Sequence, residues 1–307
     1  MKESTRSRRG ARAPKDSPHE TARRGSLEQR ARYVSARRNA ATSPAHERRR
    51  NLGRELGKNA SLRVSQKLGF ARAEPESLPG AEAVIESALG LIGRIGHEAL
   101  FQRVKKPMAK GFLPESELDL GSAYMRLALS DEVVAIVSDY LGMIPILTYV
   151  DVWYSPHVAQ PTWSSQLFHL DHADVTQLKL FLHCSDVTAA SGPLTVLPAS
   201  DSRHLAKSVD YRLAETRVTD ETVNAAVGPD RTVLDGPRGT GHFVDTSRCF
   251  HFGSRVQAGA PPRQLVVFQY LTPYAFEFQK DYRQDAPYRN LADVGAPENV
   301  RLLLGTD

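Results

Sequence analysis

The segment from Gln166 to Asp174, QLFHLDHAD, holds the side chains of this sequence best suited to chemistry. In an extended strand, side chains two residues apart project from the same face, about 6.5 Å apart along the backbone. His169 and Asp171 would then offer an imidazole and a carboxylate to one ion. A second histidine from a distant strand would complete a two-histidine, one-carboxylate set, which leaves coordination positions open and is typical of non-haem Fe(II) oxygenases.

A second His-x-Asp pair, His172 and Asp174, overlaps the first. Strand alternation separates the two pairs, because His172 faces outward if His169 and Asp171 face inward. We therefore favour the first pair as metal ligands and expect His172 to begin the turn before the next strand.

The rest of the site is expected from the segment DTSRCFHFGSR, residues 245–255. His251 follows an apparent strand and a short turn, and we expect Asp245 to cap the loop before it. Twelve residues after His251, Arg263 opens an apolar strand, where a guanidinium could bind a dicarboxylate through two parallel hydrogen bonds. Arg255 remains an alternative to Arg263.

Two amphipathic helices precede these segments. Apolar residues recur at intervals of three and four between residues 79 and 105, which predicts a helix. Ser130, followed by two acids, is suited to cap a second helix, and Gly142 stands where that helix would end.

After Met143 the sequence pattern changes to short runs of residues typical of β-strands. Helices first and strands afterwards predict an α+β protein, and the many short strands with turn residues between them favour a sandwich, jelly roll or barrel. The polar stretch 199–238 reads as an irregular insertion with weak helical character near 220–226, able to cover a binding site. The predicted strands are 144–154, 164–171, 176–183, 193–197, 241–245 and 263–272.

Residues 1–60 form a basic segment with 17 Lys and Arg against 6 Asp and Glu, although the whole 307-residue chain has a net charge of only +5. With few large apolar residues, this segment is predicted to be mostly disordered, with a transient helix at 45–57. A weak polyanion contact is its functional interpretation, since arginines neutralise phosphates. A solubilising extension is the alternative.

The sequence lacks the signals that are typical of several other classes of protein. No apolar run is long enough to span a membrane, and no apolar stretch follows the basic start as in a secretory signal. The two cysteines, Cys184 and Cys249, cannot build a disulfide framework, which favours a cytoplasmic protein. Neither a phosphate-binding glycine loop nor a GxSxG nucleophile motif is present.

Taken together, the motifs resemble the phytanoyl-CoA dioxygenase family of Fe(II)/2-oxoglutarate-dependent oxygenases. The resemblance covers about residues 140–272, and the ten-residue step from His169 to Lys179 fits the family's register. One departure is the turn Pro198-Ala-Ser-Asp201, where the family usually has Pro-Gly-Ser-His. The matching pieces are HLD at 169–171, LKLFLHCSDV at 178–187, SGPLTVLPAS at 191–200, FHFGSR at 250–255 and PPRQLVVFQY at 261–270.

The resemblance implies a double-stranded β-helix (jelly roll) core at about 143–272, behind a helical front at about 80–142, within one domain at 61–307. It implies Fe(II) held by His169, Asp171 and His251, and 2-oxoglutarate as cosubstrate with its distal carboxylate on Arg263. The expected reaction hydroxylates a small organic substrate with O₂ and releases succinate and CO₂. Halogenating relatives replace the carboxylate ligand with a small residue, so the presence of Asp171 argues against halogenation.

Two alternatives stay open. One is a jelly-roll metalloenzyme with the same ligands that does not use 2-oxoglutarate, for which a buried arginine at 263 would have no purpose. The other is a non-catalytic binding module on the same scaffold. The substrate, the oligomeric state and the choice between hydroxylation, desaturation and cyclisation are not encoded in any motif of the sequence.

Overall fold

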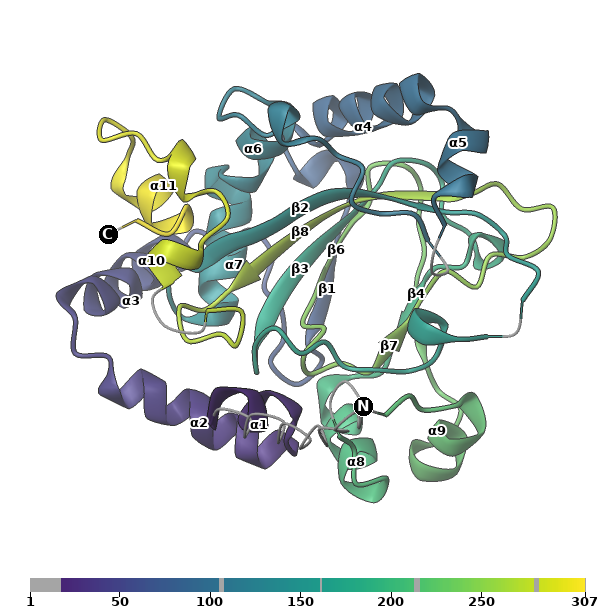
Figure 1. Ribbon diagram of the computed structural model, residues 1–307, viewed down its shortest axis with the longest axis horizontal. Helices are drawn as coiled ribbons and strands as arrows, with labels where there is room; N and C mark the ends of the chain where they lie inside the picture. Colours follow the sequence, from purple (N-terminus) through teal and green to yellow (C-terminus); the bar gives the residue numbers. More distant parts are fainter. Residues whose placement is uncertain (1–17, 105–107, 161, 213–215, 279–281, 307) are drawn as a thin grey trace, which may run out of the picture.

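The computed structural model describes residues 18–104, 108–160, 162–212, 216–278 and 282–306 (Figure 1). Its centre is a pair of antiparallel sheets. The larger sheet has the strand order β1-β6-β3-β8-β2 and the smaller sheet the order β5-β4-β7. The strands are β1 (Phe70–Ala73), β2 (Ile146–Ser155), β3 (Gln177–His183), β4 (Leu194–Val196), β5 (Thr232–Leu234), β6 (Gly241–Val244), β7 (His251–Phe252) and β8 (Arg263–Leu271).

The chain alternates between the two sheets. After β2 in the larger sheet, His169 forms an antiparallel bridge beside β7 of the smaller sheet, and the chain then returns to the larger sheet as β3. It continues through β4 and β5 of the smaller sheet, β6 of the larger sheet and β7 of the smaller sheet, and β8 of the larger sheet completes the winding. This winding between two facing sheets is a double-stranded β-helix, which confirms the predicted jelly roll within an α+β fold.

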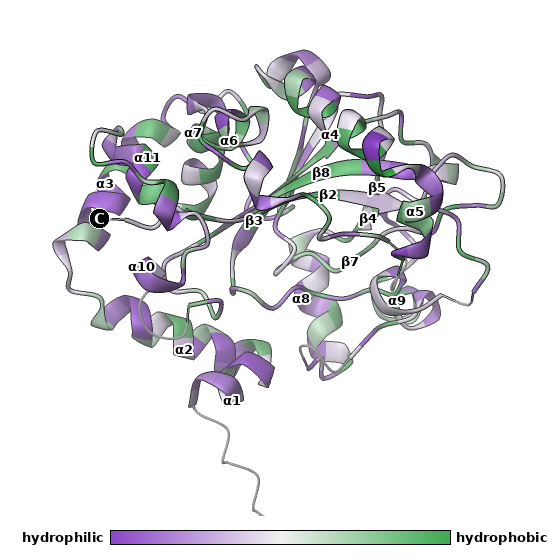
Figure 2. Ribbon diagram, turned by 45° about the horizontal axis from the view of Figure 1, so that its top comes forward, coloured by the Kyte–Doolittle hydropathy of each residue, from purple (hydrophilic) through white to green (hydrophobic). Residues whose placement is uncertain are grey.

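Alternate residues of β3 face two different cores. Leu178, Leu180 and Leu182 pack with the helices of the front half, whereas Phe181 packs between the two sheets. The apolar side chains of β8 divide in the same way, and Figure 2 shows this strand as a largely hydrophobic ribbon. The interior of the jelly roll therefore receives the odd-numbered side chains of β3.

The helical front consists of α4 (Ala81–Ile95), α5 (His97–Gln102), α6 (Ala123–Ala128) and α7 (Asp131–Leu141). The predicted ends of α7 are confirmed, because the Ser130 hydroxyl accepts a hydrogen bond from the Val133 amide and Gly142 has a positive φ of 70°. Gly96, with φ of 85°, separates α4 from α5 and divides the single helix expected at 79–105. Within the described residues, no helix is both long and apolar enough to cross a membrane.

Some predicted elements differ from the structure. The strand expected at 164–171 is a 3₁₀ turn, η3 (Ser164–Gln166), followed only by single bridges at Phe168 and His169. The insertion is more ordered than expected, since α8 (Ala199–Ser208) begins at its first residue and α9 (Asp220–Val227) and β5 follow. The remaining short elements are η1 (Pro75–Ser77), η2 (Glu115–Glu117), η4 (Ala189–Ser191), η5 (Arg289–Leu291), α10 (Tyr282–Asp285) and α11 (Glu298–Leu303).

The prediction of disorder is wrong for residues 18–57, which form α1 (Pro18–Arg24), α2 (Leu27–Ala40) and α3 (Pro44–Gly57). This segment is polar, as its colour in Figure 2 shows, and it is held in place by arginines that donate to backbone carbonyls. Arg30 and Arg49 are 1% and 0% exposed. The prediction failed because it counted apolar side chains and overlooked the ability of a guanidinium to satisfy several carbonyls at once. Residues 1–17 lie outside the described residues.

Candidate metal centre

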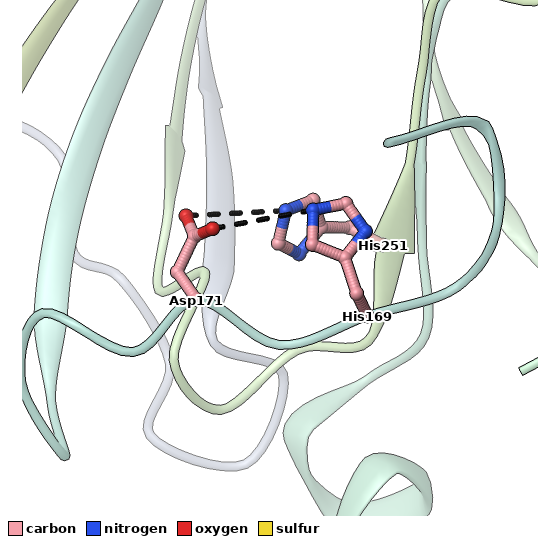
Figure 3. A group of neighbouring side chains, drawn as sticks. All are labelled: His169, Asp171 and His251. Atoms are coloured by element: carbon pink, nitrogen blue, oxygen red, sulfur yellow. Dashed lines mark ion pairs between the residues drawn. The ribbon is translucent and has the colours of Figure 1, made fainter. Parts of the chain in front are cut away.

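His169, Asp171 and His251 meet inside the jelly roll (Figure 3). The first and last of these lie on adjacent backbone segments, where each amide donates to the other's carbonyl at 3.1 Å. Asp171 faces both rings from the far side of the site, with its two carboxylate oxygens each 4.0 Å from one histidine Nε2. Their potential ligand atoms all lie within 4.8 Å of one another, and no second group of three such side chains occurs among the described residues. The cluster is suited to binding iron.

The orientation of both imidazoles is fixed by their Nδ1 atoms. His169 Nδ1 donates to the Leu167 carbonyl and His251 Nδ1 donates to the Cys249 carbonyl, each at 2.9 Å. A carbonyl only accepts, so the proton of each neutral ring sits on Nδ1 and the lone pair on Nε2. Outer hydrogen bonds of this kind commonly orient metal-binding histidines. Both Nε2 lone pairs are therefore available on the side that faces Asp171.

The charge states of the three groups suit a cation. Burial, with a smaller contribution from His251, lowers the pKa of His169 to about 3, and burial also lowers the pKa of His251. Burial by itself raises the pKa of Asp171, but the nearby Lys179 ammonium, which also donates a hydrogen bond to it, brings the pKa well below its usual range. Two neutral imidazoles and one carboxylate result at neutral pH.

Lys179 and Gln177 hold the Asp171 carboxylate. Lys179 Nζ lies 2.6 Å from Oδ2, and Gln177 Nε2 donates to the same oxygen at 3.3 Å. Both side chains come from odd-numbered positions of β3, so they enter the interior together. Neither Lys179 nor Gln177 was predicted as a site residue from the sequence. The parity of β3 was the signal that could have placed both beside the carboxylate.

His172 and Asp174, the overlapping His-x-Asp pair, do not belong to the cluster. The Asp174 carboxylate is fully buried and accepts hydrogen bonds from the Val175 amide and from the amide and hydroxyl of Thr272. It therefore ties the turn after Asp171 to the end of β8. His172 borders the cavity of the site instead of facing away from it, but it is not part of the three-residue cluster.

Asp245 closes the loop that leads to His251, as expected. Its carboxylate accepts from the amides of Ser247 and Arg248 at 3.1 and 3.2 Å, and from the Tyr140 hydroxyl at 2.8 Å. Burial raises its pKa to about 7. The group lies 3.9 Å from the Arg248 guanidinium.

Arg263 is buried with most of its bonding capacity unused. It is 3% exposed, and its Nη2 donates to the Ser254 hydroxyl at 2.8 Å. Its Nε and Nη1 have no hydrogen-bond partner among the described residues. Burial lowers its pKa to about 10, which still leaves the side chain cationic. A buried cation with two free donors is suited to an anionic ligand.

Arg255, the alternative anion site, is already occupied by protein groups. Its guanidinium forms two hydrogen bonds with the Asp220 carboxylate, at 3.1 and 2.8 Å, and donates to the Gln166 carbonyl. It also stacks on Phe252 at 3.4 Å from the ring centroid. Arg263 therefore has more hydrogen-bonding capacity left for an anionic ligand than Arg255 has.

One cavity of about 310 Å³ joins the cluster to Arg263. Its walls come from β2, β3, β8 and the insertion, and they combine aromatic rings with polar and charged side chains. Arg217 reaches the cavity from the insertion, beside Val218, which pairs with Phe168 through two backbone hydrogen bonds. Besides the residues already named, the lining includes Lys110, Tyr149, Trp153, Ser165, Phe181 and Glu277.

Comparisons with known proteins gave structural similarities only. No family model and no curated protein matches the sequence. The solved structures with a similar chain course include the epimerase SnoN in complex with Fe3+, alpha ketoglutarate and nogalamycin RO (15% identity, 73% of this chain and 85% of that chain, TM-score 0.46). EctD from S. alaskensis with bound Fe is 16% identical over 68% of this chain and 77% of its own, with a TM-score of 0.48. HygX from Streptomyces hygroscopicus with nickel and 2-oxoglutarate bound is 14% identical over 69% and 88%, with a TM-score of 0.45.

Proposed function

We propose that this protein is an Fe(II)/2-oxoglutarate-dependent dioxygenase that hydroxylates a small organic metabolite and releases succinate and CO₂. One observation carries the proposal: a two-histidine, one-carboxylate cluster shares a cavity with a buried arginine that has two unused donors. The cluster alone would fit several metalloenzymes. The arginine adds a place for the acidic end of a cosubstrate.

The residues of the site fit both Fe(II) and 2-oxoglutarate. Two imidazole nitrogens and one carboxylate oxygen are the donor set of non-haem Fe(II) oxygenases, with adjacent positions left open for other ligands. His169, Asp171 and His251 would hold the iron. When bound, the iron and 2-oxoglutarate together supply the activation of O₂ and the oxidising power for the substrate.

Arg263 would bind the distal carboxylate of 2-oxoglutarate. A carboxylate can accept from two adjacent guanidinium nitrogens at once, such as Nη1 and Nη2, which would give a partner to one of the two nitrogens that have none among the described residues. Ser254 restricts the orientation of the guanidinium by accepting from Nη2. A metalloenzyme that does not use 2-oxoglutarate would gain nothing from this cation, so the first alternative is disfavoured.

The remaining residues would position the ligand carboxylate and the substrate. Lys179 and Gln177 fix the Asp171 carboxylate through their contacts with Oδ2. The aromatic side chains of the cavity wall would limit the access of bulk water to the reacting groups, and the insertion around Arg217 would shape the substrate pocket. We also propose that the chain is a phytanoyl-CoA dioxygenase family member, on the motifs quoted above. Two buried free thiols, Cys184 and Cys249, are consistent with a cytoplasmic setting.

The test is an anaerobic titration of the purified chain with Fe(II) and 2-oxoglutarate. A weak visible charge-transfer band that requires both additions is expected, because chelation of the metal by the 2-oxoacid produces it. Succinate release stimulated by candidate small molecules would then identify the substrate. If metal binds but 2-oxoglutarate neither produces a band nor yields succinate, the cosubstrate assignment is wrong.

A further inference from the structure

Helix α2 of the N-terminal segment is hydrogen-bonded to the loop that carries Asp171. Arg30 of α2 donates from Nη2 to the carbonyls of His172 and Asp174, at 3.3 and 2.9 Å. From Nη1 it donates to the carbonyl of Arg23 in α1, at 3.0 Å. One guanidinium thus joins the two N-terminal helices to the backbone directly after the candidate ligand.

This contact is buried. The Arg30 side chain is 1% exposed, and its guanidinium carbon lies 4.5 Å from the centroid of the Phe276 ring. Hydrogen bonds from a charged donor in such a place are stronger than neutral ones. The Ser247 hydroxyl donates to the same Asp174 carbonyl at 2.7 Å, so the loop is held from the N-terminal side and from the loop before His251.

The loop has little freedom to place Asp171 in another way. The Asp171 amide donates to the Thr246 carbonyl at 2.8 Å, and three residues later the Asp174 side chain is tied to Thr272. Arg30 binds the carbonyl of His172, which lies between these two fixed points, and the carbonyl of Asp174, which lies at the second one. A shift of this stretch would move the carboxylate relative to the two imidazole nitrogens.

Arg49 of α3 is a natural comparison within the same chain. It is 0% exposed, donates to the carbonyls of Ile144, Pro145 and Leu302, and lies 5.0 Å from the Tyr282 ring centroid. The two arginines thus have the same burial, the same kind of acceptors and the same aromatic contact. They differ in the backbone that they hold, because the carbonyls bound by Arg49 lie before β2 and in α11.

We propose that Arg30 is a positioning residue for the metal centre: it fixes the 172–174 backbone and thereby keeps the Asp171 carboxylate turned toward His169 and His251. This inference rests on the proposed metal site. It makes α2 a functional part of the centre, in place of the disordered tail expected from composition.

The test compares Arg30→Gln with Arg49→Gln in the full chain, using Co(II) as the probe metal. Both substitutions remove a buried cation from backbone carbonyls, and both are expected to lower the melting temperature. Only Arg30→Gln is expected to weaken Co(II) binding, by about 10- to 100-fold, as for other residues that orient metal ligands. It should also change the visible absorption of bound Co(II), which reports the ligand geometry and is insensitive to stability by itself.

Arg30→Lys keeps the charge and one donor group, and an affinity between those of wild type and Arg30→Gln is expected. It also carries the comparison if Arg30→Gln does not fold. Equal Co(II) affinities and equal spectra for the Arg30 and Arg49 variants would overturn the inference while the metal site stands. A wild-type chain that does not bind Co(II) would overturn the proposed site and this inference together.

Discussion

The jelly roll contains two pairs of buried histidines, and only one of them forms a candidate metal site. The ring centroids of His169 and His251 are 4.3 Å apart with an interplanar angle of 48°, and those of His183 and His242 are 5.0 Å apart at 53°. His183 follows the same odd-numbered face of β3 as Lys179 and Phe181. The pairs are alike in type, spacing and burial.

What separates the two pairs is the group opposite them. Asp171 faces the first pair, whereas no carboxylate joins the second pair in a three-residue cluster within the described part of the chain. The Nδ1 atoms of the first pair are bound to carbonyls, which turns Nε2 toward the carboxylate. In the second pair, the Nδ1 atoms have no hydrogen-bond partner among the described residues. Two neighbouring imidazoles are thus not sufficient, and a third ligand together with outer hydrogen bonds distinguishes the site.

The largest effect is expected from Asp171→Ala, which would make the first pair resemble the second. Loss of the charged ligand should weaken Co(II) binding by more than about 100-fold, beyond the usual effect of losing an outer-shell partner. Calorimetric titration of folded protein measures this loss. Metal binding that survives with near wild-type affinity would show that Asp171 is not a ligand.

The next largest effect concerns Arg263. Arg263→Gln should weaken 2-oxoglutarate binding by about 10- to 100-fold, as expected when hydrogen bonds to a charged group worth about 1.5–3 kcal/mol are lost. The affinity for the metal should stay within about twofold of wild type, a change of about 0.4 kcal/mol in binding free energy. The band of the iron–2-oxoglutarate complex provides the measurement.

Arg255→Gln is the matched control for this prediction, because Asp220 and the Gln166 carbonyl already occupy that guanidinium. Its affinity for 2-oxoglutarate should remain close to that of wild type. If the Arg255 variant lost more affinity than the Arg263 variant, the two assignments would have to be exchanged.

A smaller effect on stability is expected from the second histidine pair. Burial lowers the pKa of His183 to about 3 and that of His242 to about 4, below the usual value of 6.5. Since the unfolded chain binds these protons first, each neutral histidine contributes stability above pH 6.5 that is lost as the pH falls toward its folded-state pKa. His183→Gln should reduce the slope of unfolding free energy against pH by up to about 1.4 kcal/mol per pH unit. Urea denaturation between pH 4 and 6.5 measures the slope, and an unchanged slope would contradict the assigned burial of a neutral ring.

The smallest effect is expected from His172→Ala. This residue borders the cavity but is not part of the cluster, so Co(II) affinity should change by less than about twofold, or about 0.4 kcal/mol. A loss comparable with that of Asp171→Ala would reopen the alternative pair.

The sequence by itself determined the chemical types at the site and the order in which they occur along the chain, although the strand expected at 164–171 did not form. A histidine and an aspartate two residues apart, a distant histidine and a following arginine were legible without coordinates, as were the caps of α7 and most strands. These features are local, because side-chain alternation and capping depend on a few neighbouring residues.

The tertiary structure alone decided which similar residue has bonding capacity left. It showed that Asp220 occupies Arg255 while Arg263 keeps two donors free, and that Lys179 reaches Asp171. It also showed that basic residues 18–57 fold against the barrel. Composition could not indicate this, because two of the three carbonyls that Arg30 binds, those of His172 and Asp174, lie more than a hundred residues away in the chain. Every residue has a carbonyl, so only the fold determines which carbonyls a guanidinium meets.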